Sequence, residues 1–465
     1  MTPTLRDYQT RDRDRLRREY ATGAKAVLYQ APTGSGKTVL FSHIADGAAA
    51  RGKRIAVVVH RQELLDQCSR ALHALELDHG IVAAGRHPSL THRVMVCSAQ
   101  TLVRRLGRMP AFDLLVLDEA HHATAGTWRK IIDAQPQARL LGVTATPLRL
   151  DGRGLGSACG GVFDRLVVGP TCAGLIEQGY LSPFTVYAPP STLDLSGVRK
   201  QAGDYARGQL AERVDRPKII GDAVAHYERL CKGAPAIAFC ATVAHAEHTA
   251  EQFRAHGFRA ESIDGTLSPA IRRQRIEALG HGHLNVLTSC EIVSEGTDIP
   301  VVAVAILLRP TQSLGLYLQQ VGRALRPAPG KERALILDHV GNVARHGFPD
   351  DERDWSLDGL RQAKAKEPVE SVRTCESCYA AFRPVLAACP ICGASYQPKA
   401  REIEQAEGDL QEITAAQREA MQRQRRVEVG RAQTLDDLLA VAERRGYNSG
   451  WAYHIWRARQ RKGAA

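Results

Sequence analysis

The chain has 465 residues, 24% of them charged and 44% hydrophobic, which suits a globular protein with more than one hydrophobic core. The longest apolar run, residues 301–308, is far too short to cross a bilayer, and the polar first residues do not resemble a signal peptide, so a cytoplasmic protein without membrane contact is expected. A formal net charge of +12 favours a polyanionic partner such as nucleic acid, although it could also serve solubility alone.

Gln9 lies in the segment LRDYQ near the start of the chain. Its carboxamide offers one donor and one acceptor side by side, which matches the N6/N7 edge of adenine. An ordinary helix start would explain the segment on its own. Because a phosphate-binding motif follows, we interpret Gln9 as a contact to adenine.

Residues 26–38, AVLYQAPTGSGKT, join a buried-type apolar run to a glycine-rich turn and an apolar-periodic helix. This pattern predicts a phosphate-binding loop, because glycines let backbone N–H groups turn inward and a helix N-terminus attracts anions. Ala31 stands where the first glycine is usual. Lys37 is expected to reach the β- and γ-phosphates and Thr38 to place its hydroxyl on Mg²⁺. The nucleotide-binding residues predicted in the loop are Gly34, Ser35, Gly36, Lys37 and Thr38.

Further apolar runs at 54–60 and 94–98 alternate with helical segments, which predicts a parallel sheet with helices on both faces. Ligands of such sheets bind at the carboxyl ends of the strands. Arg61, Gln100 and Thr101 follow these two runs, and we expect them to face nucleic-acid phosphates. A simple connection from strand to helix is the alternative.

Asp118 and Glu119 come directly after another apolar run. Adjacent carboxylates at the end of a buried strand suit a nucleotide site, with Asp118 on the metal and Glu119 orienting the attacking water. His121 is expected to relay the state of the site to neighbouring loops. Thr144 and Thr146 end the next run and could hydrogen-bond back to the acidic pair.

A second series of apolar runs leads to a helix at 314–325. Arg323 and Arg326 are three residues apart and therefore share one face of it. They could be ordinary salt-bridge residues. Opposite a phosphate loop they are better interpreted as arginine fingers, a contact worth about 10³ to 10⁵ in rate in nucleotide hydrolases.

Eleven cysteines are an odd number, and four of them form two close pairs. Two such pairs predict one tetrahedral Zn²⁺ site of structural type rather than a disulfide framework. A redox dithiol is the alternative. The predicted zinc ligands are Cys375, Cys378, Cys389 and Cys392.

The last part of the chain carries two further patterns. A charged stretch rich in Glu, Gln, Ala and Arg predicts an exposed helix or a linker. Aromatic residues among arginines then predict a small helical module, whose aromatics either form its core or stack on bases. The predicted organisation is residues 1–183 for the ATP-binding lobe, 184–347 for the second lobe beginning with a connector, 370–397 for a zinc ribbon, 398–432 for the charged helix or linker and 433–465 for the helical module.

Taken in their fixed order, these motifs resemble those of superfamily 2 helicases of the DEAD/DEAH-box class. Residues 144–155, TATPLRLDGRGL, and 179–183, GYLSP, are most similar to the RadD-like branch of bacterial and phage DNA-repair helicases. The resemblance implies two tandem RecA-like lobes that bind ATP·Mg²⁺ between them. It assigns no role to Arg149 or Asp151.

The resemblance also implies roles for residues of the second lobe. Gly296 and Asp298 would line the nucleotide side of the cleft, Gln319 would bridge toward the γ-phosphate, and Thr288 would touch the nucleic-acid backbone. Gln320 stands where many relatives carry an additional arginine.

The predicted function is that of an ATP-dependent helicase or translocase, acting on nucleic acid in repair or recombination. DNA is preferred to RNA on the resemblance alone, and repair or single-strand-binding proteins are candidate partners. An ATP-switched clamp without unwinding activity and an RNA helicase are the alternatives. A small-molecule kinase would share the phosphate loop but not a second lobe with two arginines. The oligomeric state is not predicted.

Overall fold

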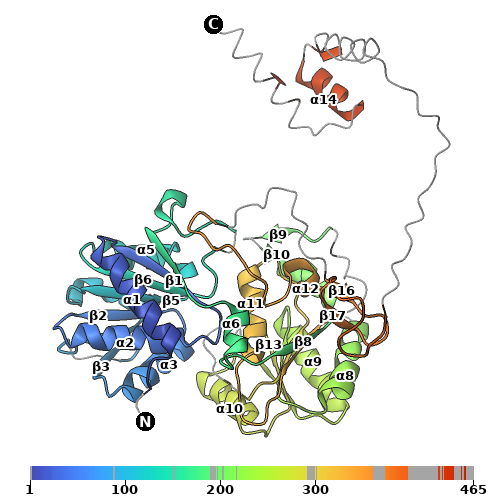
Figure 1. The fold of residues 1–465 in the computed structure, drawn as a ribbon, viewed down its shortest axis with the longest axis horizontal. Coiled ribbons are helices and arrows are strands. Elements are labelled where there is room, and N and C mark those ends of the chain that lie inside the picture. Colours follow the sequence, from blue (N-terminus) through green and yellow to red (C-terminus); the bar gives the residue numbers. More distant parts are fainter. Residues whose placement is uncertain are drawn as a thin grey trace. The chain divides into compact units, whose positions relative to one another are not determined.

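The computed structural model contains two compact units, Met1–Tyr396 and Gln397–Ala465. The larger unit holds two α/β lobes, coloured blue to teal and green to orange in Figure 1. No helix among the described residues has the length and apolar character needed to cross a membrane. The residues described are 3–86, 90–149, 152–188, 195, 197–201, 204–215, 217–290, 299, 301–359, 372–395, 428–429, 432, 434–444, 452 and 455–456.

The first lobe is built on a seven-stranded, all-parallel sheet with the order β3-β4-β2-β5-β6-β1-β7. Its strands are β1 (Ala26–Gln30), β2 (Ile55–Val59), β3 (His79–Val82), β4 (Val94–Ser98), β5 (Leu114–Asp118), β6 (Arg139–Thr144) and β7 (Arg165–Val168). Its helices are α1 (Asp7–Ala21), α2 (Lys37–Ala49), α3 (Gln62–Ala74), α4 (Ala99–Arg105) and α5 (Gly126–Asp133). The register pairs Gln30 with Thr144 and Asp118 with Val143, so the strands carrying the site residues end at one edge.

Both faces of this sheet are covered, as a fully buried strand such as β1 requires. Val27 and Tyr29 belong to one hydrophobic cluster, and Ala26 and Leu28 belong to another on the opposite face. Successive side chains of a strand point to opposite faces, so a run without polar alternation needs helices on both. The prediction of a doubly covered parallel sheet is confirmed.

The second lobe contains an eight-stranded sheet with the order β12-β13-β11-β14-β15-β8-β17-β16. Its strands are β8 (Phe184–Tyr187), β11 (Ala236–Phe239), β12 (Ala260–Ile263), β13 (Val286–Ser289), β14 (Val304–Leu307), β15 (Ala334–Asp338), β16 (Arg373–Thr374) and β17 (Ala380–Phe382), and β9 (Lys200–Gln201) and β10 (Asp204–Tyr205) form a separate hairpin. The helices are α6 (Cys172–Glu177), α7 (Arg207–Val214), α8 (Pro217–Cys231), α9 (Val243–Ala255), α10 (Pro269–Gly280), α11 (Leu314–Ala324) and α12 (Asn342–His346).

Two features of this sheet differ from what the sequence suggests. Phe184–Tyr187 falls in the predicted connector, yet it forms β8 and pairs parallel with β15. The hairpin of β16 and β17 lies in the cysteine-rich segment and pairs antiparallel with β8. The cysteine hairpin therefore extends the second sheet instead of standing apart from it.

Hydroxyl side chains define where the helices of the second lobe begin. Thr242, Ser268 and Ser313 precede α9, α10 and α11, and each accepts a hydrogen bond from the backbone N–H three residues later. Such caps satisfy N–H groups that the first turn of a helix leaves without a partner. The start of α11 is thus fixed by Ser313. The helix ends at Ala324, one residue earlier than predicted, so it carries Arg323, whereas Arg326 lies just beyond its end.

The smaller unit is described in part and contains α14 (Leu435–Arg444). Leu438 and Val441 of this helix are buried together with Ala452, and Trp456 packs against them. At least one of the terminal aromatics therefore serves the core of a helical module. The predicted charged segment 398–432 lies almost wholly outside the described residues.

Gly142 of β6 provides a test of packing in the first lobe. A Cβ atom at this position would lie 2.3 Å from Cζ of Phe163 and 2.8 Å from Cδ1 of Leu28. We expect Gly142→Ala to destabilise the lobe by about 1 to 3 kcal/mol through overpacking, measured as a lower chemical-denaturation midpoint. Gly126→Ala is the matched control, because nothing lies within 4 Å of that position. Equal midpoints for the two variants would contradict this packing.

Candidate functional site

The predicted phosphate loop turns from β1 into α2. Gly34 and Gly36 have φ values of +86° and +74°, in the left-handed region that favours glycine. A Cβ on Gly36 would lie 2.7 Å from Nε2 of Gln9, and one on Gly34 would lie 2.8 Å from Cδ2 of Leu181. Glycine is thus required at both positions by conformation and by close neighbours. Helix α2 begins at Lys37 and points its N-terminus into the loop.

Lys37 folds back over this loop. Its Nζ donates to the backbone oxygens of Ala31 and Pro32, at 3.1 and 3.2 Å. The pKa of Lys37 is lowered, chiefly by burial, while Glu119 and Asp118 oppose the shift and Arg326 and Arg323 add to it. Five charged groups from both lobes therefore act on one another at this point. Thr38 follows Lys37 in the first turn of α2.

The acidic pair lies at the end of β5. Asp118 is buried, and its Oδ1 accepts a hydrogen bond from the backbone N–H of Glu119 at 3.1 Å. Burial and the neighbouring Glu119 raise the pKa of Asp118 to about 7, while Lys37 counteracts the shift. Glu119 has a φ of 50°, an uncommon value for a residue with a side chain. Strain of this kind is concentrated at functional sites.

The predicted coupling residues meet beside the acidic pair. Nδ1 of His121 lies 3.4 Å from a carboxylate oxygen of Glu119 and 3.5 Å from Oγ1 of Thr144. The Thr144 hydroxyl also donates to the backbone oxygen of Thr146 at 2.9 Å. The ring of His122, to which the sequence assigns no role in the site, packs at a tilt against that of His121, with 4.1 Å between the ring centroids. The loop after β6 is thereby connected to Glu119.

Helix α11 brings the second lobe against this site. A Cβ on Gly322 would lie 2.6 Å from Cβ of Thr33, and one on Gly315 would lie 2.8 Å from Oγ1 of Thr146. The glycines of α11 therefore allow its backbone to approach the phosphate loop and the loop after β6. Arg323 is buried, with 6% of its surface exposed, and Gln319 lies one turn before it and is also buried. The two lobes meet at the predicted nucleotide site.

Gln9 contacts the phosphate loop directly. Its Nε2 donates to the backbone oxygens of Ser35 and Gly36, at 3.3 and 3.1 Å, and its Oε1 accepts from the N–H of Arg6 at 2.9 Å. The hydroxyl of Tyr8 donates to the same Ser35 oxygen at 2.6 Å. The side-chain amide of Gln9, predicted to contact adenine, thus holds the backbone of the phosphate loop through two hydrogen bonds.

Sequence reasoning missed an aromatic and basic cluster next to Gln9. The guanidinium of Arg6 lies 4.2 Å from the ring centroid of Tyr180, and the rings of Tyr8 and Tyr180 are 5.5 Å apart. A flat heterocycle such as adenine could pack on these groups. Arg6 and Tyr8 shortly precede Gln9 and could have been noticed, whereas Tyr180 comes from the linker segment 169–183, far along the chain.

The predicted nucleic-acid contacts divide into two groups. Arg61 and Gln100 lie together, because Nε of Arg61 is 3.2 Å from Nε2 of His60 and the amide of Gln100 donates to the His60 oxygen at 3.0 Å. Thr101 is the next residue on α4 and is half-buried. Thr288 is fully buried in β13, where its hydroxyl donates to the backbone oxygen of Ala246 at 2.7 Å. We therefore do not place Thr288 at a nucleic-acid surface.

Gly296 and Asp298, which the resemblance assigns to the nucleotide cleft, lie outside the described residues. Their predicted roles stay predictions.

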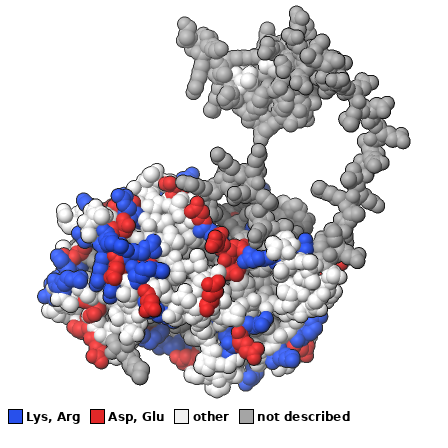
Figure 2. Space-filling view, in the orientation of Figure 1, with Lys and Arg blue, Asp and Glu red and all other residues white. Residues whose placement is uncertain are grey.

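On the face drawn in Figure 2, the charged side chains of the first lobe are of both signs. Figure 2 shows Lys and Arg over the first lobe with Asp and Glu among them. On α1, Arg11 and Arg13 pair with Asp12 and Asp14 at 3.2 and 3.0 Å. The basic charge of this helix is thus partly neutralised within it, and we do not place the nucleic-acid contact there.

The four cysteines predicted to bind zinc form one cluster in the structure. Their sulfur atoms all lie within 4.8 Å of one another, with 3.6 Å between Cys375 and Cys392 and between Cys378 and Cys389. Tetrahedral Zn²⁺ with Zn–S bonds of about 2.3 Å would place sulfurs about 3.8 Å apart, so the group fits. Backbone N–H groups of Cys378 and Ser377 lower the pKa of Cys375 to about 6, which favours the thiolate that binds metal.

Comparison with known proteins agrees with this architecture. The family model "Type III restriction enzyme, res subunit" matches residues 2–149, and "Helicase conserved C-terminal domain" matches residues 222–328. A fragment of a candidate HsdR subunit of a type I restriction enzyme from Vibrio vulnificus YJ016 has a TM-score of 0.58 at 21% identity, covering 75% of this chain and 68% of that one. At this identity the likeness supports the fold alone.

Two curated relatives extend over both lobes. A "51.5 kDa protein" of a Lactococcus phage (isolate 7-9) is 31% identical over 371 residues, which cover 79% of this chain and 78% of that protein. The candidate ATP-dependent helicase IRC3 of Saccharomyces cerevisiae is 28% identical over 360 residues, covering 73% of this chain and 52% of the yeast protein. This chain thus spans most of the phage protein and about half of the yeast one. With both helicase models in tandem on two RecA-like lobes, the chain belongs to the ATP-dependent helicases of superfamily 2.

Proposed function

We propose that the protein is an ATP-driven motor that moves along or separates strands of nucleic acid, with DNA as its track in repair or recombination. The close approach of α11 to the phosphate loop, where a Cβ on Gly322 would lie 2.6 Å from Cβ of Thr33, carries this proposal, together with the charged groups of both lobes that act on Lys37. Arg323 and Arg326 come from the second lobe, and Asp118 and Glu119 from the first. Nucleotide hydrolysis that depends on both lobes is the basis of a motor that opens and closes.

The residues present fit ATP and Mg²⁺. Three cationic side chains, Lys37, Arg323 and Arg326, face two carboxylates in a poorly solvated place, which leaves positive charge for a polyphosphate. Thr38 and Asp118 would hold Mg²⁺, a hard cation that prefers oxygen ligands. Bound there, Mg²⁺ neutralises phosphate charge during transfer.

We assign the reaction to this chain's residues as follows. Glu119 accepts a hydrogen bond from the attacking water and orients it toward the γ-phosphate. Arg323 and Arg326 donate to the phosphate oxygens where negative charge grows, and Gln319 bridges toward them from one turn earlier on α11. His121, through Thr144 and Thr146, connects Glu119 to the loop that touches α11. Closure of the lobes would thus complete the site.

The nucleic-acid track would lie at the carboxyl edge of the first sheet. Arg61 and Gln100 both contact His60 there, and Thr101 follows Gln100 in the first turn of α4. A net charge of +12 favours such a polyanion. DNA rather than RNA, and the narrower likeness to RadD-like repair helicases, rest on the motifs at residues 144–155 and 179–183. Single-strand-binding or repair proteins would be partners in that setting.

Steady-state ATP hydrolysis with defined nucleic acids tests this proposal. We expect single-stranded or duplex DNA to stimulate hydrolysis more than RNA does, at one fixed salt concentration. Glu119→Gln should keep ATP binding and lose turnover by at least about 10²-fold, because it cannot orient the water as a base does. Lys37→Ala should instead weaken nucleotide binding itself.

The alternatives give different results in the same assays. Turnover that DNA stimulates, with neither strand displacement nor movement along DNA, would favour an ATP-switched remodelling factor. Stronger stimulation by RNA would favour an RNA helicase. A Glu119→Gln protein with the unmodified rate would contradict the assignment of the base.

We also propose that the four clustered cysteines hold one structural Zn²⁺. Elemental analysis should find about one zinc per chain, and Cys389→Ser should lose it and lower the thermal midpoint, because bound metal stabilises the fold that binds it. Cys159→Ser, outside the cluster, is the matched control. A metal-free protein of unchanged stability, or full zinc content in Cys389→Ser, would contradict the site.

A further inference from the structure

The chain connects its two lobes a second time. Residues 169–183 lead from the first lobe to the second, and after α12 the chain returns to the first lobe through residues 347–359, which we call the strap. Leu357 of the strap packs against the first-lobe cluster that contains Leu155 and Phe163. The strap is the orange-brown segment between α11 and the first lobe in Figure 1.

The strap ends on a hairpin of the first lobe formed by residues 148–149 and 152–163, which we call the dock. The N–H of Gly156 donates to the Leu357 oxygen at 2.9 Å, and Arg153 forms a β-bridge with Gly359. Nη2 of Arg149 closes the dock by donating to the Cys159 oxygen at 2.9 Å. The TATPLRLDGRGL segment thus includes a binding site for another part of the same chain.

Glycines shape the dock to accept the strap. A Cβ on Gly154 would lie 1.8 Å from the Leu357 oxygen and 2.4 Å from the Gly359 nitrogen, and its three nearest atoms all belong to the strap. A Cβ on Gly156 would lie 2.9 Å from Cβ of Leu357. Neither glycine has a positive φ, so the close approach of the strap, and not backbone conformation, excludes a side chain.

The other end of the strap is fixed to the second lobe. The guanidinium of Arg353 donates to the backbone oxygen of His346 in α12 at 3.2 Å. The hydroxyl of Tyr317 in α11 donates to the backbone oxygen of Gly347 at 3.0 Å. Arg383, which lies between the two cysteine pairs, forms ion pairs with Asp350 and Asp351. The strap is therefore held by the second lobe and by the cysteine hairpin.

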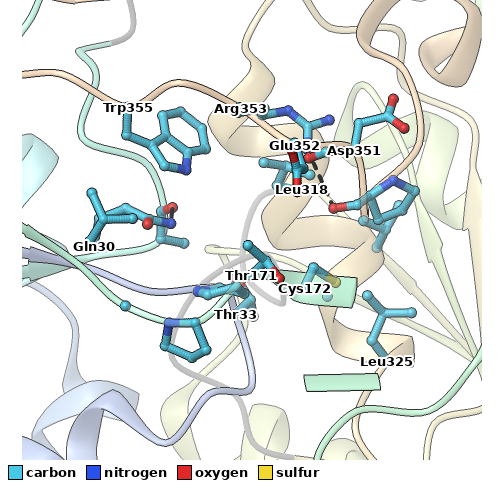
Figure 3. A pocket seen from close by; sticks show the side chains of 18 residues that line it. Gln30, Thr33, Thr171, Cys172, Leu318, Leu325, Asp351, Glu352, Arg353 and Trp355 are labelled. Atoms are coloured by element: carbon cyan, nitrogen blue, oxygen red, sulfur yellow. Dashed lines mark hydrogen bonds between the residues drawn. The ribbon is translucent and has the colours of Figure 1, made fainter. Parts of the chain in front are cut away.

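The middle of the strap lies beside the contact between α11 and the phosphate loop. A hollow that is partly open to solvent is lined by Trp355 and Arg353 of the strap, by Gln30 and Thr33 of the first lobe and by Leu318 of α11. Figure 3 shows these residues, with Trp355 near Gln30 and the strap along α11. The strap thus spans the same two elements that must meet for hydrolysis.

We propose that the strap is a positioning element for ATP hydrolysis, which stays docked on the first lobe through the cycle and guides α11, with Arg323 and the nearby Arg326, onto the phosphate loop each time the lobes close. This inference rests on the proposed ATPase function. No strap residue needs to touch the nucleotide. Its effect is on the placement of the two arginines, and small misplacements of such groups are costly in rate.

Gly154→Ala tests the dock selectively, because the added methyl group collides with the strap. We expect kcat for ATP hydrolysis to fall at least about tenfold while KM changes less than about threefold, the signature of a lost transition-state contact. Gly107→Ala is the matched control, since nothing lies within 4 Å of that position. A Gly154→Ala protein with the kcat of the control would overturn the proposal.

A reversible lock tests whether the strap stays docked. Sγ of Cys159 lies 3.6 Å from the Asp358 oxygen and 4.0 Å from Oδ1 of the same residue, so Asp358→Cys should form a disulfide with Cys159 on mild oxidation. We expect the locked protein to keep kcat within about twofold of its reduced form. A large loss of kcat that reductant restores would show that the strap must leave the dock, which overturns the proposal. Cys159→Ser in the same background controls for oxidation of the zinc cysteines.

The rate of disulfide formation gives a readout that does not depend on ATP. Adding Gly154→Ala to Asp358→Cys should slow cross-linking, because the strap no longer rests on the dock. Equal cross-linking rates with and without Gly154→Ala would contradict the claim that the strap rests on the dock. An unmodified protein without ATP turnover would instead overturn the proposed function, so the two failures are distinguishable.

Discussion

The approach of α11 to the phosphate loop is the contact on which the rest of the structure depends. Gly322 faces Thr33 so closely that no side chain fits between them. This contact places Arg323 and Arg326 within electrostatic reach of Lys37. Three positive charges and the carboxylates of Asp118 and Glu119 act on one another there, and the positive charges suit a polyphosphate ligand. The geometry therefore links nucleotide binding to the contact between the lobes.

Several parts of the fold hold α11 and the phosphate loop in place. Register aligns the ends of β1, β5 and β6, which brings the phosphate loop and the acidic pair to one edge. The Ser313 cap fixes the start of α11, and the strap spans α11 and the first lobe beside the linker segment 169–183. The cysteine hairpin reaches the same region through Arg383 and the carboxylates of the strap.

Local sequence patterns were enough to predict the central strands, the short motifs of the site and the family. The runs that became β1, β2 and β5 contain five consecutive buried residues each, a signal that a single segment carries. The phosphate loop, the acidic pair and the cysteine pairs are short motifs whose chemistry is set by neighbours in sequence. The two RecA-like lobes and the family followed from their order, and both are confirmed.

Features made by distant segments could not be predicted in the same way. β8 is only four residues long, and its place in the sheet depends on β15, far along the chain. Tyr180 and Arg6 meet because the linker segment passes over the start of α1. The role of Gly154 appears only when Leu357 is seen against it. For these residues the sequence gives the type of side chain but not the distant residue that it contacts.

The most direct test of this account is nucleotide binding and turnover by Gly322→Ala. Its methyl group would meet Thr33 and hold α11 away from the phosphate loop. The account predicts that ATP binding changes little, because the loop belongs to the first lobe, while turnover falls at least about tenfold, because the arginines lose their position. Gly208→Ala, at an exposed position of α7 with nothing within 4 Å, should match the unmodified protein. Full turnover by Gly322→Ala would contradict the claim that the second lobe completes the site.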